Sequence, residues 1–221
     1  MRELDNRLMR HIDLLVERYP SLESAKNDIV AAYLLLEESY ENGGKLLVAG
    51  NGGSVADAEH IVGELMKGFY LKRPFPEEKR AVIAAQTESL LPGTAELLQQ
   101  ALPAIDLTQH GALSTAVQND LEPLLTAAQQ VAGYGKPGDV VLGISTSGNA
   151  KNVALAVGVA KALGLSTIGL TGGSGGQLKE LCDCAIIAPA HTPADVQEYH
   201  LPIYHTLCAM LEEKFFGETE K

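Results

Sequence analysis

The first candidate for chemistry is a histidine and a carboxylate that share one helical face. His60 and Glu64 stand four residues apart within a run of helical apolar periodicity over 56–67. At this spacing an imidazole and a carboxylate can hold a divalent metal ion together, or act as a base and its orienting partner. The same spacing is also common in solvated surface pairs, so the pair alone leaves both interpretations open.

A second group of polar side chains lies in the C-terminal helix expected over 195–216. Gln197 and His205 are eight residues apart. That spacing leaves them about 80° apart after two helical turns, and therefore on one broad face. Glu198 and His200 point away from that face, and we expect both to be structural.

Three consecutive hydroxyl side chains, Ser145, Thr146 and Ser147, lie between an expected strand and an expected helix. Hydroxyls and the free backbone N–H groups of a helix N-terminus would converge there on an anion, which the helix dipole also favours. The run lacks the lysine of a P-loop, and the chain has no Gly-x-Gly-x-x-Gly turn with a following acidic residue. We therefore expect a small phosphate ester as the ligand, with simple capping of the helix as the alternative.

A second turn of the same kind strengthens this expectation. Asn51-Gly52-Gly53-Ser54 follows an apolar run, and segments 46–54 and 141–149 share the order strand, Gly/Ser/Asn turn, helix. Two such turns place two helix N-termini at the carboxyl ends of parallel strands, where open α/β sheets bind ligands. The repeat favours an anion site over a simple helix cap.

The elements that would position these side chains alternate between strands and helices. Continuous apolar runs predict buried parallel strands, and helical periodicity predicts helices between them. The expected strands are 45–50, 102–107, 139–144, 166–170 and 184–189, and the expected helices are 56–67, 123–131, 151–163, 177–181 and 195–216, the last kinked or broken at Pro202. This order predicts an α/β fold with a parallel sheet that is covered on both faces.

Two segments lie outside this alternation. Residues 1–42 have the pattern of an antiparallel pair of helices, with Pro20 ending the first and Ser21 capping the second. Such a pair could pack only on the core or form a dimer contact, and both remain open. Residues 71–101 contain three prolines and a charged cluster at 77–80, and we expect a partly helical insertion over the sheet edge.

Composition narrows the classes of function. The 221 residues are 46% hydrophobic and carry a net charge of −11. So acidic a chain is not expected to bind nucleic acid or a membrane surface, and its apolar fraction argues against disorder. No apolar stretch reaches the length of a membrane span.

The cysteines indicate a compartment. Three cysteines without a secretory segment favour free thiols in a reducing environment, so we expect a cytoplasmic protein. Cys182 and Cys184 have the wrong spacing for a zinc knuckle and are expected in a buried strand. Cys208 is expected to be a small core residue.

Several motifs occur together in one order along the chain. They are Gly50-Asn-Gly-Gly-Ser-Val-Ala-Asp-Ala-Glu-His60 with Glu64, then Asn119-Asp120, Gly138-Asp-Val-Val-Leu-Gly-Ile-Ser-Thr-Ser-Gly-Asn149, Leu170-Thr-Gly-Gly, and Gln197-Glu-x-His200 with His205. This combination resembles the SIS (sugar isomerase) domain family and, within it, the phosphoheptose isomerases. The resemblance covers nearly the whole chain apart from 71–101. It implies a single SIS domain over 1–221, a three-layer α-β-α fold around a five-stranded, flavodoxin-like parallel sheet.

The resemblance also implies roles for individual residues. The zinc ligands of the family match His60, Glu64, Gln197 and His205, while its base matches Glu64 and its acid matches His205. The implied substrate-binding residues are Asn51, Gly52, Gly53, Ser54, Glu64, Asn119, Asp120, Ser145, Thr146, Ser147 and Gln197. The family is tetrameric with active sites where subunits meet, so we expect a homo-oligomer, a dimer or a tetramer, that binds a phosphorylated sugar.

The expected activity is that of an aldose–ketose isomerase using acid–base enediol chemistry with zinc. The expected reaction converts sedoheptulose 7-phosphate to D-glycero-D-manno-heptose 7-phosphate. Two departures matter: Ala150 stands where the family has a serine, and 71–101 is longer than the family's linker. They leave open an SIS isomerase of another phosphosugar, or a non-catalytic SIS protein that binds sugar phosphates as a regulator or adaptor.

Overall fold

The centre of the molecule is a parallel sheet, and the computed structural model describes residues 4–217 around it. Its strands are β1 Leu46–Ala49, β2 Ala104–Asp106, β3 Val140–Ile144, β4 Ser166–Gly172 and β5 Cys184–Ala188. They lie in the order β2-β1-β3-β4-β5, and every pairing between neighbours is parallel. The predicted α/β fold with five parallel strands is confirmed. The strand order reverses between β1 and β3, which is where open sheets of this kind bind ligands.

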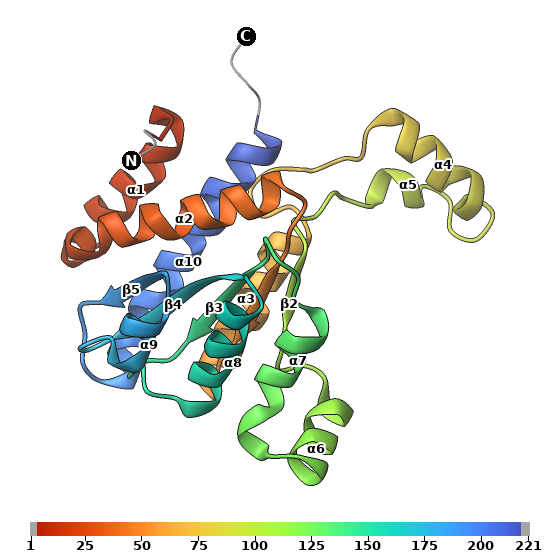
Figure 1. Cartoon of the computed structure of the whole chain (residues 1–221). Helices are drawn as coiled ribbons and strands as arrows, with labels where there is room; N and C mark the ends of the chain where they lie inside the picture. Colours follow the sequence, from red (N-terminus) through yellow and green to blue (C-terminus); the bar gives the residue numbers. More distant parts are fainter. Residues whose placement is uncertain (1–3, 218–221) are drawn as a thin grey trace.

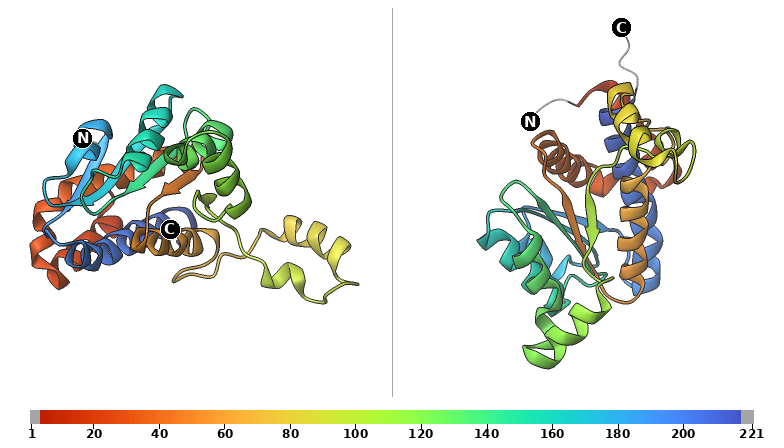
Figure 2. Two further views of the ribbon diagram at one scale, coloured as in Figure 1. Left: turned by 90° about the horizontal axis from the view of Figure 1, so that it is seen from below. Right: turned by 90° about the vertical axis from the view of Figure 1, so that its right-hand side faces the viewer.

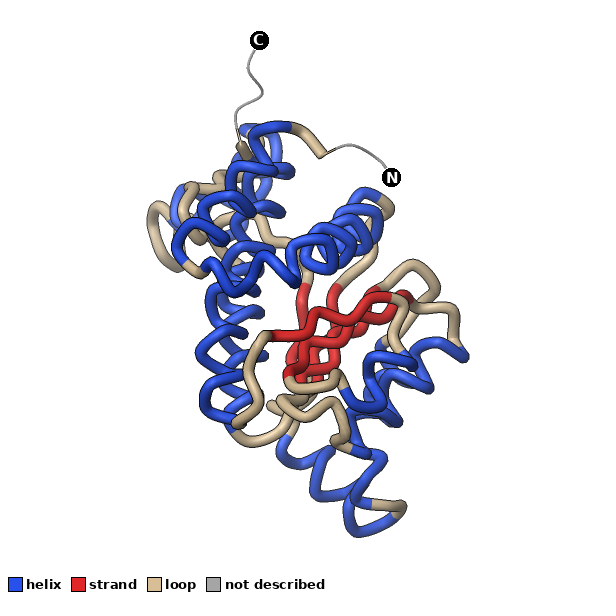
Figure 3. Tube along the Cα trace, turned by 90° about the vertical axis from the view of Figure 1, so that its left-hand side faces the viewer, coloured by secondary structure: helices blue, strands red, loops and turns tan. Residues whose placement is uncertain are grey.

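Helices cover both faces of the sheet, as Figure 3 shows. They are α1 Asn6–Arg18, α2 Lys26–Glu41, α3 Gly53–Met66, α4 Glu77–Thr87, α5 Thr94–Leu97, α6 Gly111–Asp120, α7 Thr126–Tyr134, α8 Lys151–Ala162, α9 Gly176–Leu181 and α10 Pro193–Phe216, with 3-10 helices at Pro20–Ala25 and Pro123–Leu125. The strands are buried because their side chains alternate between two apolar cores. In β1, Leu46 and Val48 face the core under α2, α3 and α10, whereas Leu47 and Ala49 face the core under α7 and α8.

Some helix boundaries differ from the prediction. The second N-terminal helix begins at Lys26 rather than after Ser21, because residues from Pro20 onward first form a 3-10 helix. Helix α6 lies where no helix is predicted, and Val117 is its one buried residue, so its sequence carries little apolar periodicity.

The two N-terminal helices do not pack along each other as the predicted pair. Helix α1 packs against α10, while α2 packs against β5 and α10. The apolar stripe of α1 is formed by Leu8, Ile12 and Leu15, which are buried in the core beneath it. The N-terminal helices therefore belong to the same core as the sheet.

Residues 74–99 form an arm that projects away from the sheet (Figures 1 and 2). The prediction that this segment lies over the sheet edge is wrong, although its partly helical character is confirmed by α4 and α5. Every residue of α4 is exposed or half-buried, because α4 packs mainly against α5. An antiparallel bridge between Pro74 and Gln99 closes the base of the arm.

Helix α10 runs unbroken through Pro202, so of the predicted kink or break at this proline the break does not occur. Thr192 caps its start by accepting a hydrogen bond from the N–H of Asp195, and Pro193 occupies the first turn, where a missing N–H costs nothing. Within residues 4–217, the structure has no helix that is both long and apolar enough to cross a membrane.

Candidate active site

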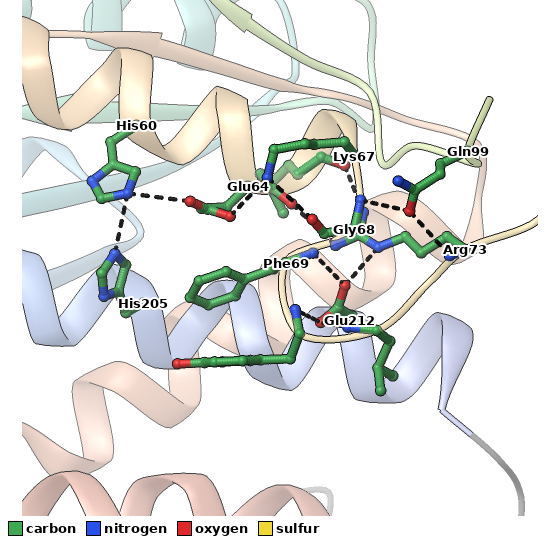
Figure 4. Close-up of polar contacts among 12 residues, drawn as sticks. His60, Glu64, Lys67, Gly68, Phe69, Arg73, Gln99, His205 and Glu212 are labelled. Atoms are coloured by element: carbon green, nitrogen blue, oxygen red, sulfur yellow. Dashed lines mark hydrogen bonds and ion pairs between the residues drawn. The ribbon is translucent and has the colours of Figure 1, made fainter. Parts of the chain in front are cut away.

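Helices α3 and α10 pack together and bring three of the predicted site residues into contact. The Nε2 atom of His60 lies 3.2 Å from Oε1 of Glu64 and 3.4 Å from Nε2 of His205 (Figure 4). His60 and Glu64 come from successive turns of α3, as their spacing predicts, and His205 reaches them from α10. The cluster is partly buried, and burial lowers the pKa of His205, with the neighbouring His60 adding to the effect.

The donor atoms around His60 have a spacing close to that of ligands in a zinc site. Ligands at 2.0–2.1 Å around a tetrahedral zinc ion are about 3.3 Å from one another. Both distances at His60 are close to that value. The second oxygen of Glu64, Oε2, is buried without a hydrogen-bond partner among the described residues, and the Lys67 ammonium lies 3.5 Å from it. Two donor pairs therefore have the spacing of zinc ligands, although residues 4–217 contain no complete group of three or more His, Cys, Asp or Glu ligands around one point.

Gln197, the fourth predicted ligand, lies at the other end of the α3–α10 contact. Its amide packs against Gly53, where even a methyl group would come within 2.3 Å of Nε2. Eight residues along α10 separate Gln197 from His205, which corresponds to about 12 Å of helix rise. The structure therefore places Gln197 beside the first Gly-rich turn instead of beside the two histidines.

Asp57 and Tyr204 extend the cluster beyond the site residues that the sequence analysis identifies. The Tyr204 hydroxyl lies 2.9 Å from Nδ1 of His60. Burial raises the pKa of the Asp57 carboxyl, an effect that the neighbouring Tyr204 hydroxyl and His60 oppose. Burial also raises the pKa of Tyr204. Asp57 stands three residues before His60, so helical spacing could have indicated it, whereas Tyr204 carries no such signal within an apolar helix.

The predicted anion loop follows β3 directly. Ser145 is buried at the strand end, Thr146 is half-buried and Ser147 is exposed. Gly148 has a φ of 67°, and a Cβ there would lie 1.9 Å from the carbonyl oxygen of Gly175, so only glycine fits. The loop is thus held in one shape against the start of α9.

The hydroxyl run does not cap the following helix. Helix α8 begins after Ala150, which makes no side-chain capping bond. Ser147 Oγ instead accepts a hydrogen bond of 3.2 Å from the N–H of Asn149 inside the loop. The side chains of the run therefore leave the first N–H groups of α8 available to a ligand, which favours the anion interpretation.

The two Gly-rich turns lie side by side, as their positions after neighbouring strands predict. Asn51 follows β1 and Asn152 opens α8 after β3, and their amides exchange hydrogen bonds of 2.9 and 2.8 Å. Ser54 is buried in the first turn of α3, and Gly52 takes a φ of 56° just before it. The pair of turns forms one edge at the carboxyl ends of β1 and β3.

Asn119 and Asp120 lie apart from these groups. They end α6, both are exposed, and Asn119 Nδ2 donates a hydrogen bond of 2.8 Å to Asp120 Oδ1. The structure does not place them against the described residues of the His60 cluster, and their substrate-binding role stays a prediction.

The residues expected to be structural behave as such. His200 is fully buried, and its Nε2 donates to the carbonyl of Thr171. Glu198 is exposed on α10. The cysteines are free thiols, and Cys184 in β5 and Cys208 in the core are buried as expected. The expectation for Cys182 is wrong, because this residue caps the end of α9 outside the strand and is half-buried.

Comparisons with known proteins agree with the fold and with the motifs. Residues 12–90 and 116–212 each match a family model described as SIS domain. The phosphoheptose isomerase of Geotalea daltonii is 41% identical over 190 residues, which cover 86% of this chain and 85% of that protein. Two solved structures are similar. The phosphoheptose isomerase GmhA of Neisseria gonorrhoeae has a TM-score of 0.69 and 28% identity, covering 94% of this chain and 97% of the other. A phosphoheptose isomerase of Francisella tularensis has a TM-score of 0.69 and 32% identity, covering 91% and 97%. The chain therefore belongs to the SIS domain family and, within it, to the phosphoheptose isomerases.

Proposed function

We propose that this phosphosugar isomerase converts sedoheptulose 7-phosphate to D-glycero-D-manno-heptose 7-phosphate. Membership of the phosphoheptose isomerases supports the reaction class, aldose–ketose isomerisation. The single observation that carries the mechanism is the meeting of Glu64 and His205 at Nε2 of His60. It brings a carboxylate and an imidazole from two helices to one place, as proton transfer between neighbouring carbons requires.

In this mechanism Glu64 removes the proton from the carbon next to the carbonyl. Its Oε2 accepts no hydrogen bond among the described residues and lies 3.5 Å from the Lys67 ammonium, so it has a lone pair for that proton. The product of the step is an enediol. The ring of His205 then gives a proton to the adjacent oxygen or carbon. General acid–base catalysis of this kind contributes about 10²–10⁴-fold.

Zinc is part of the proposal. His60, Glu64 and His205 would hold the ion, with Gln197 as a fourth ligand once its side chain leaves Gly53. The donor spacing around His60 supports this assignment. When bound, zinc supplies Lewis acidity toward the oxygens of the reacting carbons.

The phosphate end of the sugar is assigned to the loop after β3. Hydroxyls of Ser145, Thr146 and Ser147, together with the uncapped N–H groups of α8, present donors to an anion. Fixing the distal phosphate orients the reacting carbons relative to Glu64. Ala150 contributes no hydroxyl there, so another phosphosugar remains the alternative substrate.

The rival function is a regulator or adaptor that only binds sugar phosphates. Such a protein needs the two Gly-rich turns but has no use for an acid–base cluster. The contact between His60, Glu64 and His205 therefore favours the enzyme.

A homo-oligomer is also part of the proposal. The arm exposes large apolar side chains to solvent, among them Leu90 at 82% and Leu97 at 71%. Apolar surface on a projecting element is typical of a subunit contact.

The free thiols support a reducing compartment, and we assign the protein to the cytoplasm.

The deciding experiment measures deuterium exchange from solvent into the carbon next to the carbonyl, by proton NMR, over a panel of phosphosugars with zinc present. Wild-type protein should exchange this position in sedoheptulose 7-phosphate. Glu64→Gln keeps the side-chain shape but removes its basicity, so exchange should fall by at least about 10²-fold while phosphosugar binding is retained. Binding without exchange in the wild type, with every sugar tried, would support the regulator instead.

A further inference from the structure

Beside the candidate active site lies a fully buried ion pair that the proposed mechanism does not use. Arg73 and Glu212 are each 1% exposed, and Arg73 Nε donates to Glu212 Oε1 at 2.8 Å. The two residues are 139 positions apart in the chain. Burying two charges is costly unless their hydrogen bonds are satisfied, so it matters what else this pair holds.

Glu212 fixes the segment that follows α3. Its carboxylate accepts hydrogen bonds from three successive backbone N–H groups, those of Phe69, Tyr70 and Leu71, at 2.8, 2.7 and 3.0 Å. These bonds and the guanidinium supply the partners that a buried carboxylate requires. The segment is thereby held against α10.

Arg73 holds the end of α3 itself. Its Nη2 donates to the backbone carbonyl of Glu64 at 3.0 Å and its Nη1 to that of Leu65 at 2.8 Å. Carbonyls in the last turn of a helix lack helical N–H partners. Here the guanidinium of Arg73 supplies the missing donors (Figure 4). The backbone that carries the proposed base is therefore bonded directly to the buried pair.

The same segment also contacts the proposed acid. The Phe69 ring packs against the ring of His205, with 5.3 Å between the ring centroids. Phe69 can stand there because its N–H is held by Glu212. The Arg73–Glu212 pair thus fixes the backbone of Glu64 at the end of α3. Through the N–H of Phe69 it also fixes the residue that packs against His205.

We propose that Arg73 and Glu212 are positioning residues for the acid and the base, and this inference rests on the proposed function. Loss of the pair's geometry should lower kcat more than it changes KM, because the phosphate loop is held by separate bonds. A shift of the base of about 1 Å is enough to cost roughly 10²-fold in rate.

The test compares Arg73→Lys with a matched control. Lysine keeps the charge but cannot bond the carbonyls of Glu64 and Leu65 and the carboxylate of Glu212 with one planar fork. The control is Asp139→Asn, which weakens a partly buried ion pair, with Lys45, just before β3 and away from the site. Both variants should lower Tm. Only Arg73→Lys should lower kcat, by about ten- to a hundredfold, with KM within about threefold of the wild type.

An independent measurement uses the histidine ring signals of His60 and His205, assigned by NMR from His60→Gln and His205→Gln. These signals should shift in Arg73→Lys and stay in place in Asp139→Asn. If Arg73→Lys does not fold, Phe69→Leu, which retains both charges, should lower kcat and move the His205 signal. Wild-type kcat and unmoved signals in a destabilised Arg73→Lys would overturn the inference. A wild-type protein inactive on every phosphosugar would instead refute the proposed function, and the ring signals would still decide the positioning role.

Discussion

The hydroxyl of Tyr204 lies 2.9 Å from Nδ1 of His60, on the opposite side of the imidazole from Glu64 and His205. A hydrogen bond at one ring nitrogen sets the tautomer and the orientation of the other. The Tyr204 hydroxyl therefore orients the His60 ring so that Nε2 faces Glu64 and His205.

Removing this hydroxyl should weaken the site without unfolding the protein. Tyr204→Phe keeps the packing of the ring but leaves His60 without its orienting partner. We expect zinc affinity, measured by competition with a chelator, and kcat/KM each to fall by about ten- to a hundredfold. Tyr199→Phe removes a hydroxyl elsewhere on α10, the one that Ser21 donates to, and should change neither value. Unaltered zinc affinity in Tyr204→Phe would show that the hydroxyl does not orient His60.

Removing hydroxyls from the loop after β3 should weaken phosphosugar binding without lowering the stability of the protein. Ser145→Ala combined with Ser147→Ala removes two donors to the phosphate, and a hydrogen bond to a charged group is worth about 1.5–3 kcal/mol. Calorimetric titration with the phosphosugar should show affinity reduced by at least about 10²-fold, with little change in Tm. Ser24→Ala, at an exposed hydroxyl that bonds its own turn, is the control. Wild-type affinity in the double variant would mean that the hydroxyls serve the loop alone.

His200 predicts a pH dependence of stability. Burial lowers its pKa to about 4 from 6.5, and its Nδ1 is buried with no hydrogen-bond partner among the described residues. Between these two pH values the unfolded chain binds a proton that the folded chain does not, so the free energy of unfolding falls as the pH drops from about 6.5 to about 4. The full loss is of the order of 3 kcal/mol.

Urea unfolding across this pH range measures the effect. His200→Gln retains an N–H donor for the Thr171 carbonyl but does not titrate, so its stability should depend less on pH between 4 and 6.5 than that of the wild type. His191→Gln, at an exposed histidine, should keep the wild-type slope. Equal slopes in all three proteins would show that His200 is not the group responsible.

Placing charges on the arm should change the oligomeric state of the protein. Leu90→Glu with Leu97→Glu places charges on side chains that are already in solvent, so the fold of one subunit should be unaffected. If these leucines lie in a subunit contact, burying the new carboxylates is too costly and the mass measured by light scattering should fall. Leu163→Glu, on the body of the molecule, is the matched control. An unchanged mass in the double variant would exclude the arm as an interface.

The strands and the first half of the site could be predicted because their signals are local. A continuous run such as Val140–Ile144 requires two covered faces, and a spacing of four places His60 and Glu64 on adjacent turns. The contact of His205 with that pair depends on how α3 and α10 pack, and the motifs alone indicated it.

Other features have no local signal at all. Arg73 and Glu212 pair across 139 positions, and neither stands in a periodic pattern that marks it as buried. The direction of the arm is also set by tertiary contacts at its base, which a run of prolines and charges does not encode. The spacing of Gln197 and His205 places them on one face of α10. They lie at opposite ends of the contact between α3 and α10, however, so the Gln197 amide lies against Gly53 and not beside His205.

The bridge between Pro74 and Gln99 joins the two ends of the arm, so the arm is an insertion whose length the rest of the fold does not sense. The chain leaves the body and returns to it at neighbouring points, so the distance to be spanned between α3 and β2 does not depend on the length in between. The entropy of closing a loop grows only slowly with its length, at about 0.6 kcal/mol for each doubling. The arm can therefore be trimmed to a short turn or lengthened while β2 keeps its register beside β1. Its tip, between α4 and α5, is accordingly where a foreign peptide or a fluorescent label could be spliced into this protein.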